Sequence, residues 1–162
     1  MNRVVTAIFV LSLFPASVLA QADAPKGWGY GFGAIGRTSG DFGRTMAHFG
    51  GGGEGLFYKG LGAGAEIGYV TSTGGLGRGY GLLSLNATHH FIKPGSSRKL
   101  VPFLTGGYSV AFSGFASHGG NFGGGVQYWM KDNMALRLEF RDHIFSSDSP
   151  HLYGFRVGIA FR

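Results

Sequence analysis

Residues 134–144 read MALRLEFRDHI, and this stretch decides the fold. Leu136 and Leu138 alternate with Arg137 and Glu139, so apolar side chains occupy one parity and charged side chains the other. A period of two sustained over a segment of this length is the signature of a β-strand. One face of this strand therefore meets an apolar environment, and the other face meets a polar one.

The same alternation recurs along the chain in both directions from this strand. It predicts eight strands, at residues 27–37, 48–58, 61–71, 79–91, 100–112, 120–130, 134–144 and 152–161. Short segments rich in Gly, Ser or charge separate them, and no stretch has a helical period. Eight consecutive strands with short connections predict a meander, closed as a barrel or stacked as a sandwich. Residues 100–112 are apolar on both parities, so their inward face stays open.

The composition is unusual for a soluble domain of this size. Gly accounts for 32 of the 162 residues, aromatic residues for 15% and charged residues for only 14%, against roughly 25% charged residues in typical domains. A small soluble domain covers its large surface with charge, so something other than water covers part of this one. The net charge of +6 is not clustered and does not indicate nucleic acid binding, and the absence of cysteine excludes disulfides and thiol chemistry.

The side chains opposite the apolar face indicate which face points inward. They are mostly Gly, with three acidic and three basic residues, namely Glu54, Glu66, Glu139, Arg137, Arg141 and Arg156. An eight-stranded barrel has room inside only for side chains, and buried charges must pair. We therefore expect these six residues to form a charge network that plugs the lumen, while the apolar face meets lipid.

Aromatic residues near the predicted strand ends favour the same orientation. Girdles of this kind mark the two interfaces of a bilayer. The residues concerned are Trp28, Tyr30, Tyr58, Tyr80, Tyr128, Trp129 and Tyr153. The sequence thus predicts an all-β fold, an eight-stranded antiparallel up-and-down transmembrane β-barrel.

The first twenty residues have the form of an export signal. Arg3 precedes an apolar run from Val4 to Leu13, and small or neutral residues end at Ala20. The run is too short to span a bilayer, so we expect a cleaved signal peptide at residues 1–20 and a barrel domain at residues 21–162. Export combined with a lipid-facing barrel predicts the bacterial outer membrane, with both termini on the periplasmic side.

Two local motifs resemble ligand sites, but the strand pattern argues against both. Gly31-x-Gly33-x-x-Gly36 matches the dinucleotide fingerprint, which requires a helix after it, whereas here it lies within an alternating strand. His89 and His90 are adjacent on a strand, so their side chains point to opposite faces and cannot share a metal ion. We expect no cofactor and no metal.

An enzyme could use His143 and Ser146, because a base activates a hydroxyl that lies on the same face. Their spacing of three places them on opposite faces of a straight strand. We therefore expect no catalytic residues.

From Trp28 to Arg162 the chain resembles the small eight-stranded outer-membrane barrels of the outer-membrane protein A and X type. The resemblance is carried by NFGGGVQYWM-KDN-MALRLEFR at residues 121–141 and by VPFLTGGY at residues 101–108. It implies that the last strand carries the assembly signal read by the barrel-insertion machinery. The residues that match this signal are Arg156, Gly158 and Phe161. The family pattern ends on a second aromatic residue, where this chain has Arg162.

These observations predict an integral outer-membrane barrel with a plugged polar lumen and a structural or interaction role in the envelope, without enzymatic activity. The expected partners are outer-membrane lipid, lipopolysaccharide and the barrel-insertion machinery, with no nucleic acid and a monomeric state. Three alternatives remain open: an adhesin-like surface barrel, a lipid A-modifying barrel enzyme, and a secreted lipocalin-like carrier.

Overall fold

Eight strands account for most of the chain that the computed structural model describes. It describes residues 27–39, 43–74, 79–92, 99–145 and 151–162, so the predicted signal peptide lies outside the described residues. The strands are β1 (Gly27–Thr38), β2 (Thr45–Tyr58), β3 (Leu61–Ser72), β4 (Gly79–His90), β5 (Leu100–Phe112), β6 (Ala116–Lys131), β7 (Met134–Phe145) and β8 (His151–Phe161). No helix among these residues is long and apolar enough to cross a membrane.

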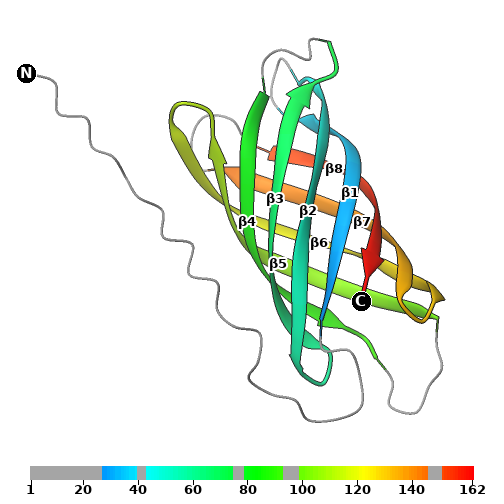
Figure 1. The fold of residues 1–162 in the computed structure, drawn as a ribbon. Helices are drawn as coiled ribbons and strands as arrows, with labels where there is room; N and C mark the ends of the chain where they lie inside the picture. Colours follow the sequence, from blue (N-terminus) through cyan, green and yellow to red (C-terminus); the bar gives the residue numbers. More distant parts are fainter. Residues whose placement is uncertain (1–26, 40–42, 75–78, 93–98, 146–150) are drawn as a thin grey trace, which may run out of the picture.

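The strands form one closed antiparallel barrel. Each strand pairs with the next in the chain, and β8 pairs with β1 to close the wall. In Figure 1, β1 to β4 run steeply through the view and β5 to β8 cross behind them. This closed meander confirms the predicted fold class.

Both ends of the described chain lie at one end of the barrel, here called the termini end. The same end holds the turn at Asp132 and Asn133 and the turn at Lys59 and Gly60, whose φ angles are 38° and 88°. Two successive positive φ angles suit the right-handed twist of a hairpin, and Gly adopts them without a Cβ penalty. The connections after β1, β3, β5 and β7 lie at the opposite end, here called the loop end.

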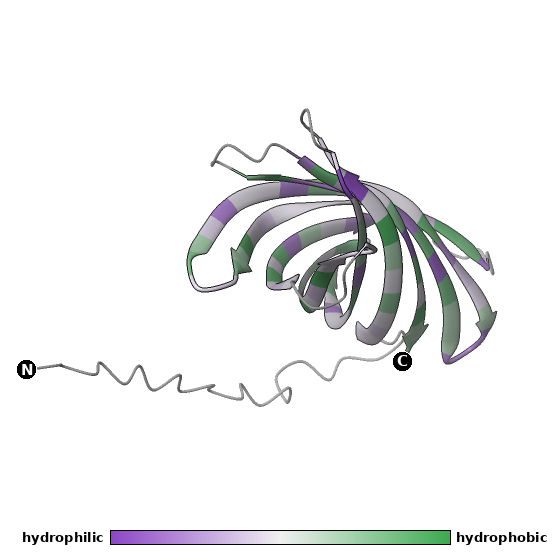
Figure 2. Ribbon diagram, turned by 90° about the horizontal axis from the view of Figure 1, so that it is seen from above, coloured by the Kyte–Doolittle hydropathy of each residue, from purple (hydrophilic) through white to green (hydrophobic). Residues whose placement is uncertain are grey.

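The outer wall is apolar. Ile67, Leu85, Phe155 and Val157 point outward from three different strands, with exposed fractions of 59%, 57%, 73% and 54%. Figure 2 shows hydrophobic and hydrophilic residues alternating along the ribbons. An apolar band on a closed barrel suits hydrocarbon and would aggregate in water.

Strand β5 resolves the face that the sequence leaves open. Thr105 and Ser109 are buried inside the barrel, and Leu104 and Tyr108 on the other parity are exposed. Both side chains face the lumen, and the Ser109 hydroxyl finds hydrogen-bond partners there that lipid lacks.

Strand β1 corrects the predicted orientation of its aromatic residues. Trp28 and Tyr30 point into the lumen, each 8% exposed, while the glycines between and after them face outward. Trp129 and Tyr80 also pack inside, in the two apolar clusters of the lumen. The girdle assignment was therefore wrong for these four residues. The Trp28 ring packs against that of Trp129, and the Tyr30 ring lies against the Arg137 guanidinium.

Two strands start earlier than predicted. β2 begins at Thr45 rather than residue 48, and β6 begins at Ala116 rather than residue 120. The Gly- and Ser-rich start of β6 reads as loop by composition, yet it pairs with β5 through Val110 and His118. The connection between β5 and β6 is therefore only three residues, Ser113 to Phe115.

Candidate functional site in the barrel lumen

The lumen brings together all six charged residues that the sequence assigns to it. Strands β2, β3, β7 and β8 direct these side chains inward because each residue occupies the parity opposite the apolar positions. All six are at most 5% exposed: Glu54, Glu66, Arg137, Glu139, Arg141 and Arg156. Ionised groups at this depth require partners.

Glu139 lies at the centre of the network and contacts all three arginines. Arg137 Nε donates to it at 3.1 Å, Arg141 Nε at 2.5 Å and Arg156 Nη1 at 3.4 Å. Arg137 and Arg141 stand two residues before and after Glu139 on β7, so strand periodicity places all three on one face. Two of the three salt bridges therefore form within a single strand.

The other two carboxylates connect opposite walls of the barrel. Arg156 Nη2 on β8 lies 2.9 Å from Glu66 Oε1 on β3, and Tyr30 donates its hydroxyl to Glu66 Oε2 at 3.0 Å. Arg137 Nη1 lies 3.3 Å from Glu54 Oε2 on β2. Long-range pairs of this kind fix the strands across the lumen.

A histidine and a threonine complete the surroundings of Glu54. His90 Nε2 and Thr88 Oγ1 each lie 2.5 Å from its Oε1. Both side chains come from β4, where Ser84, Asn86, Thr88 and His90 form the inward parity. That polar alternation is the sequence signal from which His90 could have been assigned to the lumen.

The inward aromatic residues of β1 cover the guanidinium groups. The Cζ atom of Arg156 lies 3.6 Å from the centre of the Phe32 ring, and Cζ of Arg137 lies 4.9 Å from that of Tyr30. Phe103 stacks on Arg137 at 3.9 Å. Arg binds aromatic faces favourably when both are desolvated. This contact gives the physical reason for the reversed orientation of β1.

Apolar clusters close both ends of the network. At the termini end, Trp28, Tyr30, Ala135 and Ala160 pack together, with Trp129 against them. At the loop end, the cluster comprises Met46, Val70, Leu82 and Leu152. The charges thus lie between two apolar layers, out of contact with bulk water.

A second polar group lies between the network and the loop-end cluster. Asn121 Nδ2 donates to Ser109 Oγ at 2.9 Å, Ser84 Oγ lies 2.9 Å from the same oxygen, and His143 Nδ1 lies 3.0 Å from it. His143 is 2% exposed and lies inside the lumen. Its position on the parity of Arg141 is the signal that identifies it as a lumen residue.

The other predicted motifs lie as follows. His89 and His90 point to opposite sides of the wall, as expected for neighbours on a strand. Ser146 lies outside the described residues. Among those residues, no group of three or more His, Asp or Glu side chains is arranged to hold a metal ion.

The proposed assembly signal spans both faces of β8. Arg156 and Gly158 point inward, and Phe161 points outward with 54% of its surface exposed. The outer aromatic residue is therefore accessible from the membrane side of the wall.

An apolar exterior, a closed eight-stranded wall and a filled polar lumen define a small transmembrane β-barrel. No family model and no curated protein match the chain. Several solved structures, however, are similar to the chain. Neisserial surface protein A is similar with a TM-score of 0.66 and 13% identity, over 86% of this chain and 99% of that one.

Two further solved barrels are similar at comparable length. The N-terminal β-barrel domain of Pseudomonas aeruginosa OprF has a TM-score of 0.56 and 18% identity, over 82% of this chain and 97% of that one. The Ail protein of Yersinia pestis has a TM-score of 0.57 and 13% identity, over 86% and 99%. These proteins are bacterial outer-membrane barrels, and the chain has their fold, as the sequence predicts.

Proposed function

We propose that the protein is an integral outer-membrane barrel with a lumen closed to ions, and that its role in the envelope is structural or interactive rather than enzymatic. The observation that carries this proposal is the charge network between two apolar clusters. A small eight-stranded barrel has no spare bore beyond its own side chains. An ion crossing this lumen would have to separate buried salt bridges and pass both apolar layers.

Planar bilayers test lumen closure directly. We predict that the purified, folded chain shows no stable conductance, because the three arginines and three glutamates are paired with one another inside the wall. A porin purified and inserted by the same procedure serves as the positive control. Reproducible, long-lived channels from porin-free preparations would contradict the proposal.

The geometry also weighs against lipid A modification. A barrel enzyme acting on lipid A needs its catalytic groups on the lipid side of the wall, whereas Ser109 and His143 face the lumen and are at most 2% exposed. Comparison of lipid A acyl content with and without the protein tests this point. A change that disappears in Ser109→Ala would overturn the non-enzymatic assignment.

The expected partners follow from the two surfaces of the wall. Outer-membrane lipid and lipopolysaccharide would cover the apolar exterior, and the barrel-insertion machinery would read β8 through Arg156, Gly158 and Phe161. Each of the six lumen charges is paired within the described chain, which supports a monomer. A secreted lipocalin-like carrier would instead need a polar exterior, and Phe155 and Ile67 are exposed on this one.

Adhesion is a second candidate function. The short connection between β5 and β6 carries Phe115, which is 93% exposed at the loop end, and a neighbour of the same fold is named an attachment invasion locus protein. Exposed aromatic side chains are frequent anchors at protein interfaces. Binding of cells displaying the chain to host cells, compared with Phe115→Ser, tests this function. Equal binding by both forms would mean that Phe115 does not support an adhesive function.

A further inference from the structure

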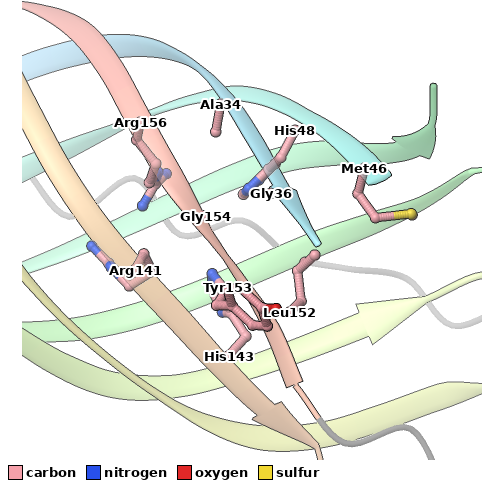
Figure 3. A pocket seen from close by; sticks show the side chains of 10 residues that line it. All are labelled: Ala34, Gly36, Met46, His48, Arg141, His143, Leu152, Tyr153, Gly154 and Arg156. Atoms are coloured by element: carbon pink, nitrogen blue, oxygen red, sulfur yellow. The ribbon is translucent and has the colours of Figure 1, made fainter. Parts of the chain in front are cut away.

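A cavity of about 20 Å³ lies in the half of the lumen nearer the loop end. Figure 3 shows Arg156, Arg141, His48 and His143 reaching into it from β8, β7 and β2. Among the described residues that line it, none is acidic, and the rest are Ala, Gly, Met, Leu and Tyr. The space suits one particle of about the size of water.

Two nitrogen atoms of these lining residues have no hydrogen-bond partner, Nε of Arg156 and Nε2 of His143. Both side chains are buried, with exposed fractions of 4% and 2%. The other two guanidinium nitrogens of Arg156 are bound to Glu66 and Glu139, so Nε is its one nitrogen without a partner. Buried polar groups normally find a partner.

A hydrogen-bond chain beside the cavity ends at Nδ1 of His143. Arg141 donates to Asn121 Oδ1 at 2.8 Å, and Asn121 in turn donates to Ser109 Oγ at 2.9 Å. Ser84 Oγ lies 2.9 Å from Ser109 Oγ, and we assign Ser84 as the donor of this pair.

Ser109 therefore directs its own hydrogen to Nδ1 of His143, 3.0 Å away. A neutral imidazole that accepts at Nδ1 carries its hydrogen on Nε2. Arg156 and His143, which carry these two nitrogens, both line the cavity.

We propose that this cavity binds one small anion with the size and charge of chloride, held by Arg156 Nε–H and His143 Nε2–H. Arg141 and His48 complete its wall, and Glu139 lines a separate cavity that Arg156 also borders. The apolar cluster at the loop end keeps water away, which strengthens the attraction between the anion and the arginines. The small volume excludes phosphate and larger oxyanions.

Chloride dependence of stability in the folded chain tests the site. The protein, folded in lipid vesicles, is unfolded in urea while sodium chloride is replaced stepwise by sodium methanesulfonate at constant ionic strength. A ligand that binds only the folded state stabilises it in proportion to its occupancy. We expect the unfolding rate to fall severalfold as chloride or bromide rises. Equal rates in chloride and methanesulfonate would overturn the proposal.

Matched histidine variants separate the site from general salt effects. His143→Phe removes the donor and fills the space, whereas His90→Phe changes a buried histidine at the other end of the charge network. We expect chloride dependence to disappear in the first variant and to persist in the second. Persistence in both would count against the site, because exterior salt effects act on both alike.

Bromide in crystals of the unaltered protein provides a test that needs no variant. We expect an anomalous peak within hydrogen-bond distance of Arg156 Nε and His143 Nε2. A water molecule there without anomalous signal in bromide-soaked crystals would overturn the proposal.

Discussion

Neighbouring residues on β8 experience opposite environments. Val157 points outward with 54% of its surface exposed, and Arg156 points inward with 4% exposed. Successive side chains of a strand lie on opposite faces, so a register shift of one residue would exchange these two environments.

Charge should therefore act in opposite ways at these two positions. We predict that Val157→Arg destabilises the barrel by roughly 2–4 kcal/mol, the cost of a cation at the hydrocarbon midplane. Arg156→Val should cost about 1–3 kcal/mol, because it removes the nearer of the two arginines that pair with Glu66. Reversible unfolding in lipid vesicles measures both.

The double variants provide the control for this prediction. Glu66→Gln should reduce the cost of Arg156→Val and leave the cost of Val157→Arg unchanged. A rescue of Val157→Arg by Glu66→Gln would mean that the strand is turned inside out.

Glycines in the wall differ in the space around them. A Cβ at Gly33, on the outward face of β1, would have no atom within 4 Å. A Cβ at Gly125, on the inward face of β6, would collide with the carbonyl oxygen of Leu138 and lie 2.8 Å from Cα of Glu139. The first position can accommodate a Cβ atom without steric conflict, whereas the second position requires Gly.

The same substitution should therefore have opposite effects at the two sites. We predict that Gly33→Ala is neutral or stabilises by up to about 1 kcal/mol, since Ala restricts the unfolded chain. Gly125→Ala should destabilise by about 1–3 kcal/mol through overpacking. Urea unfolding in vesicles measures the stability of the two variants. An equal loss of stability in both would mean that other atoms cover the outward face of β1.

At the scale of the strand, the sequence predicts orientation well where charge marks one parity. Strands β3, β7 and β8 each carry Glu or Arg among apolar residues, and all face as predicted. β1 carries only aromatic residues and Gly through Ala34, so neither parity is marked as polar. Its orientation depends on stacking against Arg137 and Arg156, which come from the far end of the chain. The periodicity of β1 alone cannot predict that contact.

The two tryptophans of the chain test the orientation of β1 and the end of β6. Trp28 and Trp129 lie 6.0 Å apart, ring centre to ring centre, inside the wall. We predict that brominated lipids quench the fluorescence of the unaltered protein weakly, because both rings are shielded from acyl chains. Phe155→Trp adds a ring at an outward position that is 73% exposed, and this variant should be strongly quenched. Strong quenching of the unaltered protein would restore the girdle assignment.

At the scale of the molecule, the sequence indicates which charged residues enter the lumen, but it does not indicate which of them pair with one another. Three Glu and three Arg on inward parities suggest pairing. The central position of Glu139 and the inclusion of His90, Ser109 and His143 depend on strand stagger and barrel closure. Those quantities are set by long-range register, which no local pattern contains.

The apolar exterior determines where the whole molecule is stable. We predict that the expressed protein fractionates with the outer membrane, requires detergent for solubility and migrates differently on gels before and after boiling. The closed wall leaves no sheet edge from which unfolding can start, so the folded form should persist in unheated detergent. Recovery of monodisperse protein from the periplasm without detergent would contradict this prediction.

The salt bridges also divide the chain into two complementary pieces. Strands β1 to β4 contribute Glu54 and Glu66, two negative charges, whereas β5 to β8 contribute three Arg and one Glu, a net of two positive charges. Two copies of the same half would repel each other in a shared interior, and unlike halves would attract. The barrel is thus suited to splitting in the connection after β4, with two separately expressed fragments that reconstitute one wall and do not form homodimers.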